Sequence, residues 1–225
     1  MTPYPEVVSE WVTLAAVING RSLARYGDGE LNLCRGGSAK LQQFHPELGA
    51  RLRGILRDAG ECAVAIPNVR SETPKAPFWS KYLSAVELLE PSHRYYSSFV
   101  TRPDSAPWID TPEYWDALQN LWLGYDVTLV RGSEKSLTAA DMVGARVTEV
   151  IAPARQAWDE YPSLLERIGT PARAILCLGP TATVLAVDLC AKGVHAIDLG
   201  HCGMFLRKHR AGEPMTVTAA DRVAV

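Results

Sequence analysis

"ARAILCLGPTATVLAVDLCAKGVHAIDLG", residues 172–200, contains two short apolar runs separated by a helical segment. The runs at 172–179 and 194–200 are predicted to be strands, and residues 181–193 are predicted to be a helix. Continuous rather than alternating apolar character is typical of parallel strands that are buried on both faces. The stretch therefore predicts a right-handed βαβ unit.

Similar units extend over the rest of the chain. Strands are predicted at residues 22–26, 61–67, 95–100, 126–132 and 147–153, helices at 5–18, 45–60, 78–90, 111–122, 137–144 and 155–169, and a polar loop at 68–77. Pro162 is expected to interrupt the last helix, and Trp11, Trp115 and Trp122 are expected in the core. The alternation predicts a Rossmann-like α/β fold in a single domain over residues 1–225, with a mainly parallel sheet covered by helices on both faces. It leaves the strand order open.

The composition is that of an ordinary soluble globular protein. The chain has 225 residues, 47% of them hydrophobic, and a net charge of −2, which gives no general attraction to nucleic acid or membranes. The five cysteines form no C-x-x-C motif and are predicted to be free thiols in a reducing compartment. A basic cluster at residues 207–210 is expected in a solvated tail. Without a signal peptide or an apolar run that could span a bilayer, the sequence predicts a cytoplasmic protein.

Glycine-rich and polar turns follow the predicted strands. The turns are Gly27-Asp28-Gly29-Glu30, Asn68, Thr101-Arg102, Gly132-Ser133-Glu134-Lys135, Gly179-Pro180-Thr181 and Gly200-His201. In an open parallel sheet, ligands bind beyond the carboxyl ends of the strands. Because acids, bases and hydroxyls accompany the glycines, these turns predict a site for a polar, phosphorylated ligand.

The acidic pair Asp28 and Glu30 allows two interpretations. Two carboxylates in one turn can face a hard cation such as Mg²⁺ or Mn²⁺, which keeps waters and substrate phosphates among its ligands. Alternatively, Asp28 caps a following helix and Glu30 supports the first turn of that helix. The spacing of the two residues does not decide between these interpretations.

Other turns carry groups that suit phosphate. A helix beginning near Thr181 would present free N–H groups and its positive dipole end to a diphosphate, or the turn is a plain helix cap. Lys135 and Arg102 are able to neutralise phosphate, and Glu134 is able to act as a base. Each of the three is equally consistent with a surface or structural residue. His201 is a candidate ligand of a metal or a phosphate.

Several of these motifs occur together in a known family. They are RYGDGE at 25–30, AIPNV at 65–69, SFVTRP at 98–103, VRGSEKS at 130–136 and the long run at 176–201. On these motifs the chain resembles the GT-D-type glycosyltransferases, whose fold is Rossmann-like. The resemblance implies transfer of a sugar from a nucleotide-diphosphate donor. It also implies that a divalent cofactor, Mn²⁺ or Mg²⁺, binds the D-x-E motif Asp28-Gly29-Glu30.

The resemblance implies roles for individual residues as well. The nucleotide sugar would be bound by Arg25, Gly27, Gly29, Thr101, Arg102, Gly132, Lys135, Gly179, Pro180, Thr181 and His201. Asp28, Glu30 and Glu134 would be catalytic, with Asp198 as a second candidate for the base. UDP-glucose is the expected donor. The family pattern ends after His201, where the basic stretch CGMFLRKHRAGEP leaves the hydroxyl acceptor open between a glycan, a small molecule and a modified nucleic-acid base.

Two other functional classes share this fold. A nucleotide-dependent oxidoreductase or methyltransferase should show G-x-G-x-x-G after an early strand, with an acid about 20 residues further on. The stretch YGDGELNLCRGG does not fit that spacing. A non-catalytic nucleotide-binding module would bind a nucleotide sugar without any metal-dependent hydrolysis, and the sequence alone does not distinguish it from an enzyme.

Overall fold

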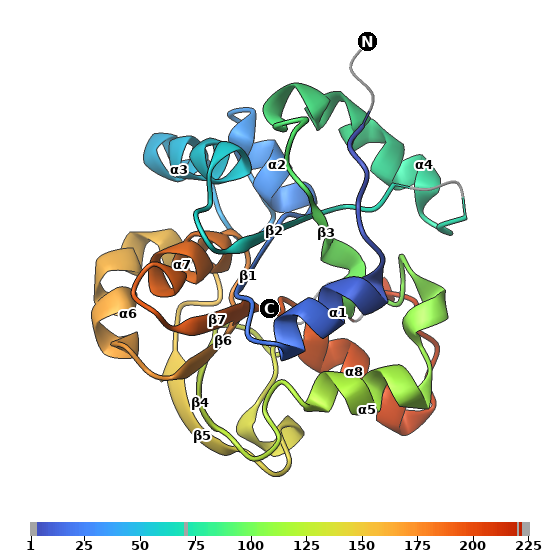
Figure 1. The fold of residues 1–225 in the computed structure, drawn as a ribbon, viewed down its shortest axis with the longest axis vertical. Coiled ribbons are helices and arrows are strands. Elements are labelled where there is room, and N and C mark those ends of the chain that lie inside the picture. The colour runs from blue at the N-terminus through green and yellow to red at the C-terminus, as the bar shows by residue number, and fades with distance from the viewer. Residues whose placement is uncertain (1–3, 70–71, 220, 222–225) are drawn as a thin grey trace.

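The computed structural model describes residues 4–69, 72–219 and 221, and it arranges seven strands into one sheet (Figure 1). The strands are β1 (Leu23–Arg25), β2 (Ala63–Ile66), β3 (Tyr96–Ser97), β4 (Asp126–Arg131), β5 (Arg146–Ile151), β6 (Arg173–Cys177) and β7 (His195–Asp198). Their order is β3-β2-β1-β7-β6-β4-β5, and every neighbouring pair is parallel. The predicted Rossmann-like class is therefore confirmed.

The α-helices are α1 (Glu10–Ile18), α2 (Asp28–Cys34), α3 (Pro46–Arg57), α4 (Ala76–Trp79), α5 (Pro112–Gln119), α6 (Tyr161–Ile168), α7 (Pro180–Cys190) and α8 (Cys202–Ala211). Several helices overlap the predicted ranges, among them α1, α3, α5 and α7, whereas the sequence predicts no helix at the position of α8. The 3₁₀ helices are η1 (Ser80–Leu88), η2 (Ser98–Thr101), η3 (Pro107–Ile109), η4 (Ala139–Asp141) and η5 (Ala157–Glu160). The predicted helix at 155–169 divides into η5 and α6, because Pro162 fits only the first turn of a helix. Of the predicted loop at 68–77, positions 70 and 71 lie outside the described residues.

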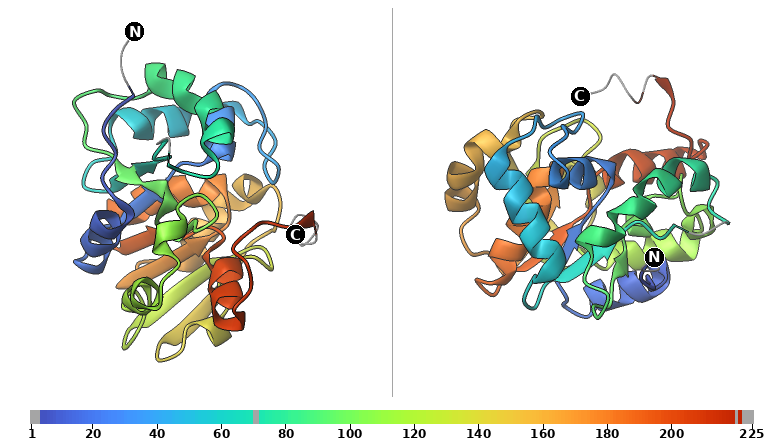
Figure 2. Two further views of the ribbon diagram at one scale, coloured as in Figure 1. Left: turned by 90° about the vertical axis from the view of Figure 1, so that its right-hand side faces the viewer. Right: turned by 90° about the horizontal axis from the view of Figure 1, so that it is seen from above.

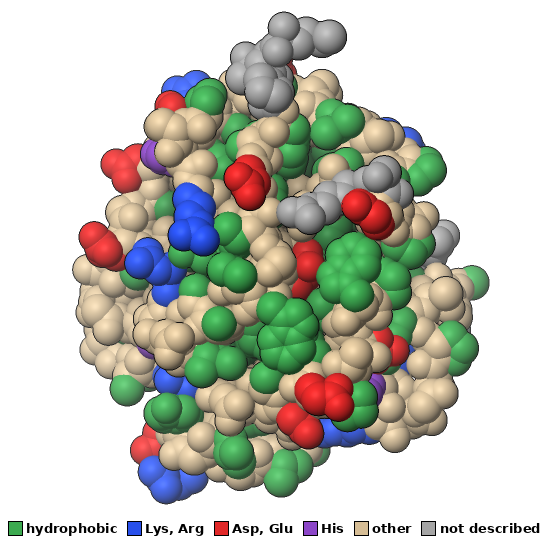
Figure 3. Space-filling view, turned by 45° about the vertical axis from the view of Figure 1, so that its right-hand side comes forward, with side chains coloured by type: hydrophobic (Ala, Val, Ile, Leu, Met, Phe, Trp, Pro, Cys, Tyr) green, Lys and Arg blue, Asp and Glu red, His purple; other side chains and the backbone are tan. Residues whose placement is uncertain are grey.

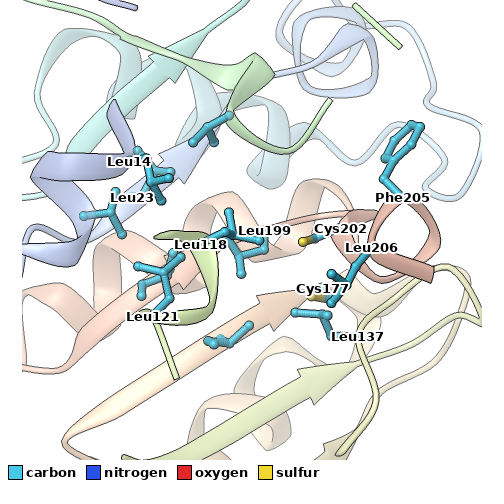
Figure 4. Close-up of a cluster of buried hydrophobic side chains, with 14 of the residues drawn as sticks. Leu14, Leu23, Leu118, Leu121, Leu137, Cys177, Leu199, Cys202, Phe205 and Leu206 are labelled. Atoms are coloured by element: carbon cyan, nitrogen blue, oxygen red, sulfur yellow. The ribbon is translucent and has the colours of Figure 1, made fainter. Parts of the chain in front are cut away.

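Alternate residues of the strands enter two separate layers of the core. In β6, Ile175 and Cys177 join the layer under α1, α5 and α8, whereas Ala174 and Leu176 join the layer under α6 and α7. Figure 4 shows part of the first layer, with Leu14 and Leu23 at one end, Leu118 and Leu199 in the middle, and Cys202 and Leu206 at the other end. The two ribbon views of Figure 2 show helices on both faces of the sheet. This two-sided burial explains the continuous apolar runs of the sequence.

The middle of the sheet joins distant parts of the chain. Leu23 of β1 pairs with Ala63 of β2 on one side and with Ile197 of β7 on the other. The chain runs outward from β1 to β3, crosses to β4 and returns to the middle through β6 and β7. Strands β1 and β7 therefore belong to opposite halves of the sheet, and a crevice at their carboxyl ends is the expected ligand site of such a fold.

The expectation of a solvated basic tail at residues 207–210 is wrong. These residues belong to α8, which packs against the sheet. Arg207 donates to Asp141 Oδ2 at 2.5 Å, and Arg210 donates to the Asp141 carbonyl at 2.9 Å. Lys208 donates to Asp221 Oδ2 at 2.9 Å. The basic side chains thus hold α8 against neighbouring loops, which a count of charges along the sequence cannot show.

The tryptophans divide between core and surface. Trp115 and Trp122 are buried as predicted, but Trp11 is 45% exposed, so its expected core position is wrong. Its ring packs edge-on against Tyr114, with ring centroids 4.8 Å apart. On the face drawn in Figure 3, hydrophobic side chains lie at the surface among acidic and basic ones.

The cysteines are unpaired and the helices are short. All five cysteines are free thiols, as predicted. Within the described ranges, no helix has the length and apolar character needed to cross a lipid bilayer. A cytoplasmic location stays a prediction.

Candidate active site

The turns after β1, β6 and β7 enclose a cavity of about 270 Å³. Its ionisable lining residues are Arg25, Asp28, Glu30, Lys40, Arg102, Lys135, Asp198 and His201. Glycines line it at 27, 29, 179 and 200, and its apolar wall consists of Ala39, Leu41, Pro180, Met204, Phe205 and Val217. The cavity thus lies at the carboxyl edge of the sheet, where the sequence predicts the ligand site.

The D-x-E motif forms the first turn of α2. Gly27 is the N-cap residue, Asp28 is the first helical residue, and the Glu30 side chain turns back so that its Oε2 accepts the Gly27 N–H at 2.7 Å. Asp28 is exposed at the mouth of the cavity, and Glu30 is buried. The capping interpretation of Glu30 is therefore correct as far as local structure goes, although Asp28 itself is not the cap. Both carboxylates still line the cavity.

Negative charge is concentrated at this end of the cavity. Burial is the largest cause that raises the pKa of Glu30 to about 7; the charges of Asp198 and Asp28 contribute to this rise, and the hydrogen bond from Gly27 opposes it. Burial also raises the pKa of Asp198 to about 6, although Arg25 opposes the shift. A bound cation would lower both pKa values, because it favours the ionised carboxylates.

The donor set suits a divalent cation that keeps other ligands. Within the part of the chain that the structure describes, no group of three or more His, Cys, Asp or Glu side chains is placed to hold a metal ion. Asp28 and Glu30 supply two carboxylates, so phosphate oxygens and waters would have to complete the shell. Mg²⁺ and Mn²⁺ bind in this way in phosphate-transfer sites. The residues therefore fit an ion that is bound together with a phosphorylated ligand.

Arg25 is held in the cavity by the end of η2 and the turn after β7. Its Nη1 donates to Thr101 Oγ1 at 2.5 Å, and that hydroxyl donates to the Leu199 carbonyl at 3.1 Å. Gly200 has a φ of 52°, and a Cβ on it would lie 3.2 Å from Arg25 Nη1. Glycine is therefore needed at 200 both for the backbone conformation and for the close approach of the guanidinium.

Arg102 is fixed by a buried carboxylate. Its Nε and Nη2 donate to Asp104 Oδ1 and Oδ2 at 2.8 and 2.9 Å, and Lys75 also donates to Asp104. The Asp104 side chain is 1% exposed. Burial raises the pKa of Asp104, but the charge and hydrogen bonds of Arg102 outweigh burial and lower it. The guanidinium also lies 6.0 Å from the ring centroids of both Trp79 and Phe205.

Positive charge also dominates the surroundings of His201. Burial lowers the pKa of His201 to about 3, and the charges of Arg102, Lys135 and Arg25 contribute to this shift. Burial and the charge of Lys40 lower the pKa of Lys135. An imidazole that stays neutral among several cations indicates a region built for an anion, since an anion would relieve their repulsion.

The α7 helix begins at the opposite wall. Gly179 is its N-cap residue with a φ of 69°, and Pro180 occupies the first turn and lines the cavity. Thr181 is fully buried, and its Oγ1 has no hydrogen-bond partner among the described residues. Thr183 Oγ1 donates to the Arg25 carbonyl at 2.8 Å, which ties α7 to β1. The positive end of this eleven-residue helix thus faces the cavity next to Arg25.

Four of the predicted site residues do not line the cavity. Thr101 orients Arg25, and Thr181 is buried in the first turn of α7. Gly132 is a packing position, because a Cβ there would lie 2.8 Å from the Pro153 carbonyl oxygen. Glu134 is exposed and lines a separate depression beside α8, where its backbone carbonyl accepts from Arg207. The structure therefore gives no support to Glu134 as the base.

Sequence reasoning missed several lining residues. Lys40 and Leu41 come from the loop after α2, and Val217 comes from the segment after α8. Neither segment follows a predicted strand, so a search of the turns after predicted strands could not identify these residues. Asp104, in contrast, could have been identified from the sequence. It stands two residues after Arg102 within a polar turn and is an obvious candidate partner for that arginine.

A family model and several known proteins match this chain. The model described as "Glycosyltransferase GT-D fold" matches residues 23–218. The chain is 33% identical over 201 residues to "Probable glycosyl transferase Gly" of Streptococcus gordonii, a match to 81% of this chain and 30% of that protein. It is 30% identical over 199 residues to "Glycosyltransferase GlyD" of Streptococcus pneumoniae serotype 4, a match to 80% of this chain and 24% of that protein. The chain thus spans about a third or less of the length of these relatives.

Solved structures share the fold. A structure described as "A New Glycosyltransferase (DUF1792) from Streptococcus sanguinis" has a TM-score of 0.82 and 29% identity, with 93% of this chain and 86% of that chain covered. A second structure has the same TM-score and identity, with 93% and 83% of the two chains covered. It is described under the statement that domain of unknown function 1792 "has a distinct glycosyltransferase fold". The fold is therefore shared over nearly the whole chain.

Proposed function

Because this chain belongs to the glycosyltransferase GT-D fold family, we propose that it transfers a sugar from a nucleoside diphosphate donor to a hydroxyl acceptor. One observation carries the proposal. A single cavity brings together the carboxylates of the D-x-E motif, the N-terminus of α7 and the cationic side chains of Arg25, Arg102 and Lys135. UDP-linked glucose is the first donor to test.

The diphosphate of the donor would bind between α7 and the cationic side chains. Free N–H groups in the first turn of a helix and the positive dipole end both favour phosphate. Arg25 and Arg102 each have part of the guanidinium committed to a protein partner, Thr101 and Asp104 respectively. This fixes their orientation before the donor arrives, so binding costs less conformational entropy.

Asp28 and Glu30, in the first turn of α2, would hold Mn²⁺ or Mg²⁺ together with the diphosphate. A cation there supplies Lewis-acid stabilisation of the leaving diphosphate. Arg25 and Arg102 add fixed positive charge to the same region, where the departing nucleotide gains negative charge. Burial of Glu30 strengthens these interactions, because the site offers little water to screen them.

Asp198 is the better placed of the two candidate bases. It lines the cavity, whereas Glu134 is exposed outside it. A pKa of about 6 lets a carboxylate accept a proton from an acceptor hydroxyl near neutral pH. The apolar wall, which includes Leu41, Met204 and Val217, would then face the acceptor or the nucleobase.

A thermal-shift and hydrolysis panel tests the proposal. The protein is mixed with UDP-, GDP- or dTDP-glucose, with Mn²⁺ or with a chelator. We expect one nucleotide sugar to raise the melting temperature only when Mn²⁺ is present, and we expect slow metal-dependent release of its nucleotide. Equal stabilisation in the presence of the chelator would show that donor binding does not require the metal. Stabilisation without any release or transfer would favour a binding module, and stabilisation only by NAD(H) or S-adenosylmethionine would favour another Rossmann enzyme class.

A further inference from the structure

Part of the cavity wall is a tight turn in the loop between α2 and α3. Ala39 N–H donates to the Gln42 carbonyl at 2.8 Å, and Gln42 N–H donates to the Ala39 carbonyl at 3.3 Å. Lys40 and Leu41 are the two residues between these hydrogen bonds, and both line the cavity. The 39–42 turn therefore supplies the cavity with one cationic and one apolar side chain.

The chain at the start of η5 holds this turn. Gln156 N–H donates to the Leu41 carbonyl at 2.8 Å, and Gln156 Oε1 accepts from Gln43 N–H at 2.7 Å. Gln42 is only 3% exposed, and its Oε1 accepts from Trp158 N–H at 3.2 Å. These three hydrogen bonds join segments that lie far apart in the sequence, since 113 positions separate Gln43 from Gln156.

Gln156 makes two of these hydrogen bonds in an unusual backbone conformation. Its φ of 56° and ψ of 37° lie in the left-handed region, and among the described residues it is the only one other than glycine with a positive φ. That region is sterically unfavourable for a residue with a Cβ, whereas glycine adopts it readily. The backbone alone would favour glycine at this position. The hydrogen bond to Gln43, which glycine could not accept, gives the glutamine side chain a purpose.

The turn is held against electrostatic repulsion. Lys40 and Lys135 both line the cavity. Burial and the charge of Lys40 lower the pKa of Lys135. Because like charges repel, a turn that was free to move would place Lys40 further from Lys135. The hydrogen bonds to the start of η5 oppose that movement and keep the cation of Lys40 at the cavity.

We propose that Gln156 is a positioning residue for the donor site, and that its side chain keeps the 39–42 turn in the cavity wall. This inference rests on the proposed function, in which the cavity binds a nucleoside diphosphate. Gln156 is not among the residues that line the cavity, so it acts through Lys40 and Leu41. When only a fraction of the molecules has the competent wall, the apparent affinity falls by that fraction. Loss of the Gln156 side chain should therefore raise KM for the donor and change kcat little.

Gln156→Gly removes the side chain and keeps the N–H that donates to the Leu41 carbonyl. Because glycine adopts the left-handed conformation without strain, the melting temperature should change by no more than about 3 °C. KM for UDP-glucose, measured with Mn²⁺, should rise about five- to tenfold. Gln156→Glu keeps an acceptor oxygen for Gln43 N–H and should retain the wild-type KM. The matched control is Arg155→Ala, a change at the exposed neighbour of Gln156, which should leave KM unchanged.

Hydrogen–deuterium exchange measures the turn itself, without any substrate. Peptides that cover residues 38–45 should exchange at least about threefold faster in Gln156→Gly, because the Gln43 N–H loses its acceptor. Gln156→Glu should restore the slow exchange. Unchanged exchange in Gln156→Gly would overturn the proposal. A wild-type protein that does not turn over any nucleotide sugar would refute the proposed function and the donor role of Gln156, whereas the exchange would still show whether Gln156 holds the turn.

A double-mutant cycle tests whether Gln156 acts through the turn. Lys40→Met combined with Leu41→Ala removes both side chains that the turn supplies to the cavity, and this protein should have a raised KM. Adding Gln156→Gly to it should raise KM by less than about twofold more, since residues that act through one another are not additive. The full five- to tenfold effect in that background would overturn the proposal, and so would faster exchange with an unchanged KM, which would mark a purely structural role.

Discussion

Glu30 contributes to local structure and to the cavity with the same carboxylate. Its hydrogen bond to the Gly27 N–H fixes the start of α2, and its charge lies beside Asp28 and Asp198 in a buried position. A buried carboxylate among other carboxylates is unfavourable unless a cation or a proton compensates it. The sequence identifies this residue because the D-x-E motif is local. It does not reveal that Glu30 is buried or that Asp198 lies close to it, because the two residues are far apart in the sequence.

We expect Glu30→Gln to abolish sugar transfer and to keep the fold. The amide oxygen of glutamine is still able to accept the Gly27 N–H, so α2 starts normally, but the charge that would hold the cation is lost. Turnover should fall by at least about a hundredfold. Asp28→Asn should behave in the same way. The measurement is turnover with Mn²⁺, with circular dichroism as the control for folding, and full activity in either variant would contradict the assigned role.

Asp104 is expected to act as a positioning residue through Arg102. In Asp104→Asn, the amide retains only one acceptor oxygen, so the paired hydrogen bonds to Arg102 Nε and Nη2 are broken. KM for the donor should rise about tenfold, with a smaller change in kcat. Stability should fall by about 2 kcal/mol, because Asp104 is buried between two cations.

Lys75→Met supplies the matched control for this prediction. It removes the other partner of Asp104 but leaves the paired hydrogen bonds to Arg102 in place. Donor KM should therefore change little. Equal effects of both variants on KM, or an effect of Asp104→Asn on stability alone, would show that the role of Asp104 is only structural.

At the scale of elements, the sequence predicts the strands of the second half of the chain well. The apolar runs of β4, β6 and β7 are buried on both faces, so their composition carries a strong signal. The first half is less regular. Only Tyr96 and Ser97 of the predicted strand at 95–100 pair in β3, because the chain then turns into η2, after which Arg102 lines the cavity.

The helix α8 could not be predicted from its own residues. Its apolar residues Met204, Phe205 and Leu206 are consecutive, whereas a helix face usually shows them three or four positions apart. The structure explains the departure, because all three side chains belong to the core, and Met204 and Phe205 line the cavity as well. A helix that serves two surfaces lacks a single apolar stripe.

The approach of α8 to the loop after β4 depends on Gly203. A Cβ at 203 would clash with the backbone carbonyl group of Ser136 and lie 2.6 Å from the Leu137 nitrogen. We expect Gly203→Ala to destabilise the protein by about 2–4 kcal/mol, since backbone on both sides of the clash would have to move. The shift should also weaken donor binding, because Met204 N–H donates to the Lys135 carbonyl at 3.0 Å in this contact.

Gly54→Ala is the control within another helix. Gly54 lies inside α3, and a Cβ there would meet no atom within 4 Å. Alanine should stabilise that helix by about 0.5–1 kcal/mol. Urea unfolding measures both changes, and a Gly203→Ala protein as stable as the wild type would show that the close contact is not required.

For the whole molecule, the fold class and the edge that carries the site follow from the sequence, but the strand order does not. Parallel strands have to place their carboxyl ends together, so the turns after them converge whatever the order. Which turns become neighbours depends on the crossing from β3 to β4 and the return to β7. The sequence therefore correctly predicts that Gly27 and Gly179 lie close together. It could not exclude Gly132 and Glu134 from the same cavity.

The pH dependence of stability should reveal the buried carboxyl of Glu30. Its pKa rises from 4.5 to about 7 on folding, so the folded protein binds more protons than the unfolded chain between these values. The stabilisation from this proton is complete below pH 4.5 and is lost as the pH rises through 7. His201 has the opposite effect, because its pKa falls from 6.5 to about 3 on folding. The pH dependence of the free energy of unfolding therefore contains contributions from several ionisable groups.

A comparison with Glu30→Gln isolates the Glu30 contribution. Relative to the wild type, this variant should gain on the order of 3 kcal/mol in free energy of unfolding as the pH rises from 4.5 to 7.5. Urea unfolding of both proteins at several pH values provides the measurement. Mn²⁺ with a bound donor should reduce the difference, since the cation favours the ionised carboxylate. A difference that does not vary with pH would contradict the burial of this carboxyl.

The pairing of β1 with β7 has a consequence for biosynthesis. Leu23 leaves the ribosome well before its partner Ile197, because a long stretch of chain separates the two residues. Contacts of such long sequence separation form slowly, since a large loop has to close first. The half of the sheet made of β1, β2 and β3 therefore keeps an open flank until β7 has been synthesised, and the cavity cannot be complete before then.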